Sequence, residues 1–128
     1  MDLGPDADAV SSLKIADEVV ATIAGLAAAE VEGVAGMSGG LVGGISEMLG
    51  KKSTARGAKV EVGDKETAID LYVVVEYGVR IPEIAQRVQE NVKRAVESMT
   101  GLDVVEVNVH VQGVAFHQEG KEEEVRVR

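Results

Sequence analysis

The first clear pattern in the chain is helical. From Ala16 onward, apolar residues recur at intervals of three and four, the spacing of one helix face. Asp17 and Glu18 fall in the first turn, where the helix dipole favours negative charge, and Gly33 suits the C-terminal end. The pattern predicts a helix whose alanine-rich side packs closely on a sheet. Its apolar positions are Val19, Val20, Ile23, Leu26, Ala27 and Val31, and its small residues are Ala24, Ala27 and Ala28.

Alternating patterns farther along predict strands. Residues 58–62 and 67–77 alternate in polarity, and the turn at 63–66 between them predicts a β-hairpin. A short strand is expected at 34–37 and a strictly alternating one at 104–112. The positions predicted to face inward are Val60, Val62, Ile69, Leu71, Val73, Val75, Tyr77, Val105, Val107, Val109 and Val111.

A second amphipathic helix is predicted between the last two strands. Pro82 fits its first turn, where a missing N–H costs nothing, and Gly101 ends it. Its apolar stripe is Ile84, Ala85, Val88, Val92, Ala95, Val96 and Met99. The order helix, strand, strand, strand, helix, strand predicts an α+β fold. Two amphipathic helices would pack on one face of a small, mostly antiparallel sheet of three to four strands, leaving the other face to solvent or a partner.

The domain boundaries follow from the same patterns. Residues 13–116 are predicted to form a single domain, after a disordered leader at 1–12 that lacks the basic start of a signal peptide. Residues 38–57 read as a long, glycine-rich loop, and long loops inside compact domains are often functional. Residues 117–128 form an acidic tail expected to be flexible, although Val125 and Val127 leave open a short added strand.

Composition narrows the classes of function. Only 2% of residues are aromatic against 45% apolar, so the core must be built from Val, Ile, Leu and Ala. The formal net charge of −9 disfavours nucleic acid and anionic lipid as direct partners. The absence of cysteine excludes disulfides and thiol chemistry and fits a cytoplasmic location. The longest apolar stretch, 19–29, is too short to insert into a membrane.

The candidate motifs for catalysis or cofactor binding each lack residues that the chemistry requires. A phosphate-binding loop anchored on Gly50 and Lys51 would need glycine at position 45 and serine or threonine at position 52, where Ile45 and Lys52 stand. Of the two histidines, His110 is flanked on its strand face by Asn108 and Gln112, neither of which is acidic, and His117 lies in the predicted tail. No metal-binding or cofactor motif is recognised, and the chain is expected not to be an enzyme.

Two candidate interaction surfaces remain. Tyr72 either anchors a contact on the outward sheet face or simply suits a half-exposed strand position. The sheet surface comprises Asp70, Tyr72, Val74, Glu76, Glu106, Asn108, His110 and Gln112. The other candidate is the glycine-rich loop, which is either a plain connection or an interaction loop carrying Leu41, Val42, Ile45, Met48 and Leu49.

Taken together, the segments resemble the alkaline shock protein family, the Gls-type envelope stress response proteins of Gram-positive bacteria. The resemblance covers roughly residues 13–116, although Asp17 stands where relatives often have proline. It is carried by residues 15–20 (IADEVV), 23–28 (IAGLAA), 31–37 (VEGVAGM), 69–71 (IDL), 75–78 (VEYG), 88–92 (VQENV), 99–102 (MTGL) and 105–114 (VEVNVHVQGV).

The resemblance implies a cytoplasmic protein without enzymatic activity or catalytic residues. It further implies self-association and recruitment to the membrane through a separate, membrane-anchored protein partner. The residues themselves leave open an alternative, a regulatory domain that binds a small molecule under the 38–57 loop.

Overall fold

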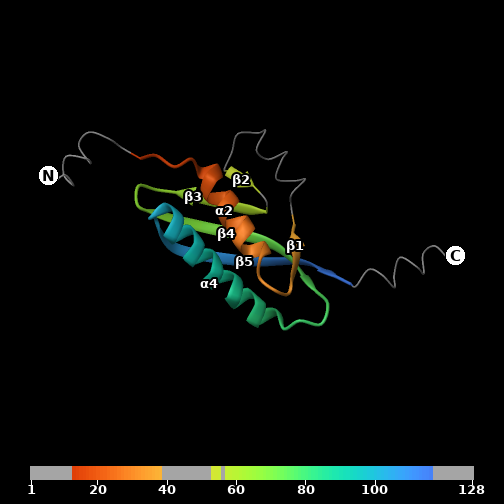
Figure 1. Ribbon diagram of the computed structural model, residues 1–128. Coiled ribbons are helices and arrows are strands. Elements are labelled where there is room, and N and C mark those ends of the chain that lie inside the picture. Colours follow the sequence, from red (N-terminus) through yellow and green to blue (C-terminus); the bar gives the residue numbers. More distant parts are fainter. Residues whose placement is uncertain (1–12, 39–52, 56, 117–128) are drawn as a thin grey trace.

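The computed structural model describes residues 13–38, 53–55 and 57–116, and the α+β prediction is confirmed (Figure 1). The elements follow the order α2 (Asp17–Ala29), β1 (Val34–Met37), β2 (Ser53–Ala55), β3 (Ala58–Val62), β4 (Glu66–Glu76), α4 (Ile81–Thr100) and β5 (Asp103–Ala115). The three-residue strand β2 lies inside the predicted loop 38–57, most of which falls outside the described residues.

The long strand β4 is the centre of the sheet. Along one edge it pairs with β5, in parallel and over its whole length. Its other edge is shared: β3 pairs antiparallel with residues 67–71, and β1 pairs antiparallel with residues 73–75. β2 continues the sheet beyond β3, also antiparallel. The sheet is therefore mostly antiparallel, and the predicted β3–β4 hairpin is confirmed.

Both helices lie on the same side of this sheet (Figure 1). As predicted, α2 turns its small residues inward, and Ala21, Ala24 and Ala28 are completely buried. The prediction that Val19 and Leu26 belong to the buried stripe is wrong, since both are nearly half exposed. Small side chains allow the helix backbone to approach the sheet closely, and this places the larger ones at the flanks.

The buried stripe of α4 follows every fourth residue, from Ile84 through Val88 and Val92 to Val96. The inclusion of Met99 was wrong: its side chain is exposed, because the next position on this row is residue 100. The predicted end of the helix is confirmed, since Gly101 adopts a left-handed conformation with φ of 79°.

The core is entirely aliphatic apart from one buried threonine, as the composition requires. The inward residues of β4 are at most 1% exposed and form the sheet side of the core: Ile69, Leu71, Val73 and Val75. Burying each such side chain contributes about 1.5–3 kcal/mol. The prediction that Tyr77 continues this inward row was wrong: it is 71% exposed, because β4 ends one residue earlier and the chain turns away.

A β-bulge corrects the prediction for β5. Thr67 is opposite Val104 and Ala68 is opposite Glu106, so Val105 is an extra residue on β5 and is 58% exposed rather than inward. Beyond the bulge the predicted alternation returns, and Val107, Val109 and Val111 are half-buried against the core. A second register shift occurs at Gln112, and the strand continues to Ala115.

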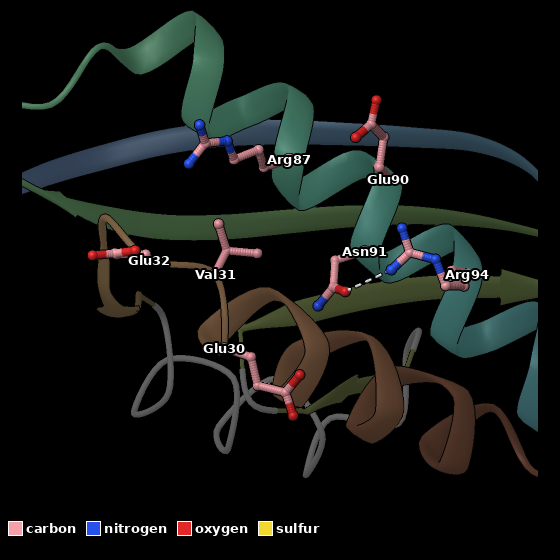
Figure 2. Close-up of a pocket in the computed structure, with 7 residues that line it drawn as sticks. All are labelled: Glu30, Val31, Glu32, Arg87, Glu90, Asn91 and Arg94. Atoms are coloured by element: carbon pink, nitrogen blue, oxygen red, sulfur yellow. Dashed lines mark hydrogen bonds between the residues drawn. The ribbon is translucent and has the colours of Figure 1, made fainter.

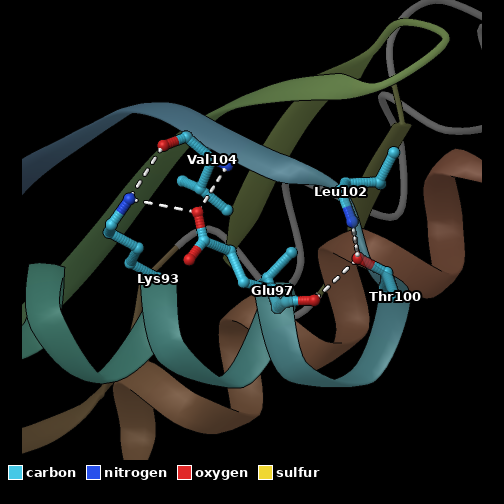
Figure 3. A network of polar contacts seen from close by, with 6 residues as sticks. Lys93, Glu97, Thr100, Leu102 and Val104 are labelled. Atoms are coloured by element: carbon cyan, nitrogen blue, oxygen red, sulfur yellow. Dashed lines mark hydrogen bonds and ion pairs between the residues drawn. The ribbon is translucent and has the colours of Figure 1, made fainter.

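Polar contacts fix the junction between α4 and β5 (Figure 3). The Glu97 carboxylate accepts hydrogen bonds from the Val104 N–H at 3.0 Å and from the Lys93 ammonium at 3.0 Å. The Val104 N–H, followed by Lys93, lowers the pKa of Glu97. The Thr100 hydroxyl donates to the Val96 carbonyl and accepts from the Leu102 N–H. These bonds set where β5 starts.

Candidate interaction surface

The pairing of β4 with β5 builds the outer face of the sheet, opposite the two helices. Alternate residues of β4 point outward, and Asp70 and Tyr72 are only partly buried. The parallel register places Asn108 beside Asp70 and His110 beside Tyr72. Residues almost forty positions apart in the sequence therefore become neighbours on one surface.

An aromatic stack occupies the middle of this surface. The rings of Tyr72 and His110 lie 4.6 Å apart between centroids and are inclined by only 11°. From β3, the Lys59 ammonium lies 5.6 Å from the centroid of the Tyr72 ring, within the range of a cation–π interaction. The three strands β3, β4 and β5 each contribute one side chain to this cluster.

A polar network holds the stack in place. Oδ1 of Asp70 accepts a hydrogen bond from Nδ2 of Asn108 at 3.1 Å and lies 3.2 Å from Nε2 of His110. The same Asn108 amide donates to the Glu106 carboxylate at 2.8 Å. Side chains of Asp70 and His110 are 38% and 43% exposed, so the pair is screened by water and adds little stability. Its main effect is to orient the imidazole.

The rest of the predicted surface flanks this cluster. Val74 lies opposite Gly113, which has no side chain to cover it. Gln112 reaches toward Ser38, whose hydroxyl donates to its side-chain oxygen at 3.5 Å. Glu76 is exposed at the end of β4. The structure thus brings all eight predicted surface residues to the outer face.

Sequence reasoning missed two features of this face. It found no acidic neighbour for His110, yet Asp70 lies beside it on the adjacent strand. It also left out Lys59, although the alternation of residues 58–62 already placed that side chain on the outward face. Only the strand register decides which outward residues touch, and the register is a long-range property.

The predicted interaction loop carries five apolar residues. Leu41, Val42, Ile45, Met48 and Leu49 all lie outside the described residues. The alternative of a ligand under the 38–57 loop therefore stays a prediction.

A separate open pocket of about 330 Å³ lies between the end of α2 and α4 (Figure 2). Asn91 spans it: Nδ2 donates to the Ala27 carbonyl at 2.8 Å, and Oδ1 accepts from the Arg94 guanidinium at 3.1 Å. The bond to Ala27 ties the last turn of α2 to α4, and the bond from Arg94 holds the Asn91 side chain from within α4, so both are structural. The lining mixes both signs of charge and consists of Glu30, Val31, Glu32, Arg87, Glu90, Asn91 and Arg94.

Within the described ranges, no group of three or more His, Cys, Asp or Glu side chains is placed to hold a metal ion. No helix in this part of the chain is long and apolar enough to cross a membrane.

Comparison with known proteins identifies the family. Residues 6–116 match the model of the alkaline shock protein 23 family, which is described as having a cell envelope-related function. The chain belongs to this family, and the predicted resemblance is confirmed.

Curated proteins of Bacillus subtilis and Streptococcus pyogenes are similar to the chain. The chain is 40% identical over 116 residues to the uncharacterized protein YqhY of Bacillus subtilis, covering 91% of this chain and 86% of that protein. It is 39% identical over 104 residues to the uncharacterized protein YloU of the same organism, covering 80% and 87%. It is 36% identical over 113 residues to a stress response regulator gls24 homolog of Streptococcus pyogenes, covering 88% of this chain and 63% of that protein. No solved structure matches the chain.

Proposed function

We propose that the protein is a non-enzymatic envelope stress response protein that acts as a self-associating adaptor or scaffold, recruited to the membrane by an anchored partner. The observation that carries the proposal is the outer face of the sheet, where Tyr72 and His110 form an oriented, partly exposed stack. The cell envelope-related function of the family and the name of the streptococcal relatives support the stress part.

The chemistry of this face suits a protein partner. A flat surface with one aromatic pair, a cation and several hydrogen-bonding groups offers both apolar contact area and directional bonds. Tyrosine is enriched among the residues that dominate binding energy, and Tyr72 is contacted by His110 of β5 and by Lys59 of β3. The surface would recognise a partner by contact with the stack and by polar bonds around it.

Recruitment through a partner agrees with the charge of the chain. A net charge of −9 is repelled by anionic lipid headgroups, so direct adsorption to a membrane surface is disfavoured. An anchored protein removes this obstacle, because it offers a specific surface in place of lipid. The adaptor itself would remain in the cytoplasm.

The test is a pull-down of the tagged protein from its own cells, with and without solubilised membranes. The double variant Tyr72→Glu, Val74→Glu should lose the membrane-anchored partner, while Met99→Glu, an exposed apolar residue of α4, serves as the control. Recovery of the same partner in equal amounts with all three proteins would refute the use of this face. Recovery of a tightly held metabolite instead would favour the ligand-binding alternative.

A further inference from the structure

The edge strand β5 is protected over only half of its length. Its first half is covered by side chains of α4 (Figure 3). Lys93 and Glu97 bond to the backbone of Val104, and Gln89 donates from its side-chain amide to the Val107 carbonyl at 3.1 Å. These contacts occupy backbone groups that would otherwise be available to another strand.

The second half of β5 has a different edge. From Asn108 to Val114, its only backbone pairing within the described residues is with β4. The stretch 107–116 also contains no Asp, Glu, Lys or Arg, in a chain with a net charge of −9. Sheet proteins commonly place charges, especially lysine, on such edges to prevent pairing with other molecules. This edge lacks that protection.

An exposed apolar cluster continues the open edge. Val114 is 45% exposed and Phe116 is 50% exposed. The ring of Phe116 packs on that of Tyr77, with centroids 5.2 Å apart. Two of the three aromatic residues of the chain are therefore at the surface, at the ends of the neighbouring strands β4 and β5.

We infer that a second copy of this chain pairs with this edge, β5 against β5, in an antiparallel and two-fold symmetric arrangement. The inference rests on the self-association in the proposed function and identifies its surface. Two molecules of charge −9 repel one another, so they approach most closely along a stretch that carries no charge. A two-fold axis near Val111 pairs the uncharged residues with one another and leaves the acidic Asp103 outside the contact.

The arrangement has a consequence for the outer face. Pairing at the edge joins two sheets into one and leaves Tyr72 and His110 of each copy uncovered. Self-association and partner binding would then use different surfaces of the same molecule. Substitutions can separate the two.

The experiment compares matched glutamate variants by size-exclusion chromatography with light scattering. Val114→Glu places like charges in the open half and should weaken the dimer about tenfold or more. Val105→Glu, on the same strand but beside the protected half, should leave the dimer unchanged, although Val105 is more exposed than Val114. Equal thermal melting of the variants checks that all are folded.

Hydrogen exchange of the unmodified protein gives a second readout. Amides in 107–116 should exchange more slowly at high protein concentration than at low concentration, while those of the β3–β4 hairpin should not change. A strict monomer with concentration-independent exchange would overturn both this inference and the self-association in the proposed function. A dimer broken by Tyr72→Glu but not by Val114→Glu would overturn the inference alone. So would a dimer that forms only after removal of residues 117–128, because that segment would then occupy the edge.

Discussion

In β4, neighbouring residues face different surroundings. Leu71 points toward the helices and is completely buried, whereas Tyr72 points to the outer face and keeps part of its ring in water. The inward residues gain free energy by leaving water, and no specific partner is needed. The outward residues are held by directional contacts such as the Asp70–His110 pair, which water screens. Stability therefore depends mainly on the inner face, whereas the outer face is the one that we propose for specific recognition.

The largest expected effect comes from the inner face. Leu71→Ala should lower the free energy of unfolding by about 2–5 kcal/mol, because it removes buried methyl groups and leaves a cavity. Val74→Ala, three residues away on the outer face, should cost about 0.5 kcal/mol or less. Urea denaturation of both variants measures the difference. Equal losses would show that the outer face is as tightly packed as the inner one.

Gly33 tests how closely the elements pack on the side of the sheet that the helices cover. It has φ of 104°, and a Cβ there would lie 2.6 Å from Cδ1 of Ile84. Gly33→Ala should destabilise the fold by about 1–3 kcal/mol through backbone strain and this overlap. Gly36→Ala is the matched control, since its added methyl would meet nothing within 4 Å. Thermal denaturation of both should separate them, and a neutral Gly33→Ala would contradict the proposed strain.

The outer network should contribute much less. A double-mutant cycle with Asp70→Ala and His110→Ala should give a coupling free energy of about 0–1 kcal/mol, because both side chains are partly exposed. Chemical denaturation at neutral pH provides the four values. A coupling well above this range would mean that the pair contributes to the stability of the fold and not only to the orientation of the imidazole.

The smallest effect concerns Glu97, at the margin of the covered side. The Val104 N–H and Lys93 lower its pKa in the folded protein. The resulting stabilisation is present above the ordinary glutamate pKa of about 4.3 and is lost as the pH falls through the lowered value. The difference in Tm between the unmodified protein and Glu97→Gln should therefore shrink as the solution is acidified.

Glu83→Gln is the control for this pH dependence. Glu83 forms an exposed ion pair with Arg80 at 3.5 Å, where water screens the interaction. Its substitution should change Tm less at every pH. If the difference in Tm between Glu97→Gln and the unmodified protein grows on acidification, the lowered pKa of Glu97 is contradicted.

Apart from the three-residue strand β2, the sequence by itself determined the elements and their order. The spacing of apolar residues in a helix, the alternation in a strand and a terminating glycine such as Gly101 are all local features. They can therefore be predicted from the order of residues alone. The aliphatic core followed from composition, because almost no aromatic residues are available. The outward positions of Asp70, Tyr72, Asn108 and His110 also followed from alternation along each strand.

Only the tertiary structure decided which of these residues meet. The parallel register sets His110 beside Tyr72 and Asp70, and no local pattern carries a contact between residues 38 or 40 positions apart. The bulge that exposes Val105, the outward turn of Tyr77 and the exposure of Val19 and Leu26 on α2 were likewise missed. Each depends on how closely the elements approach one another. The same alternation of polar and apolar residues would allow several strand registers, and packing in three dimensions selects one of them.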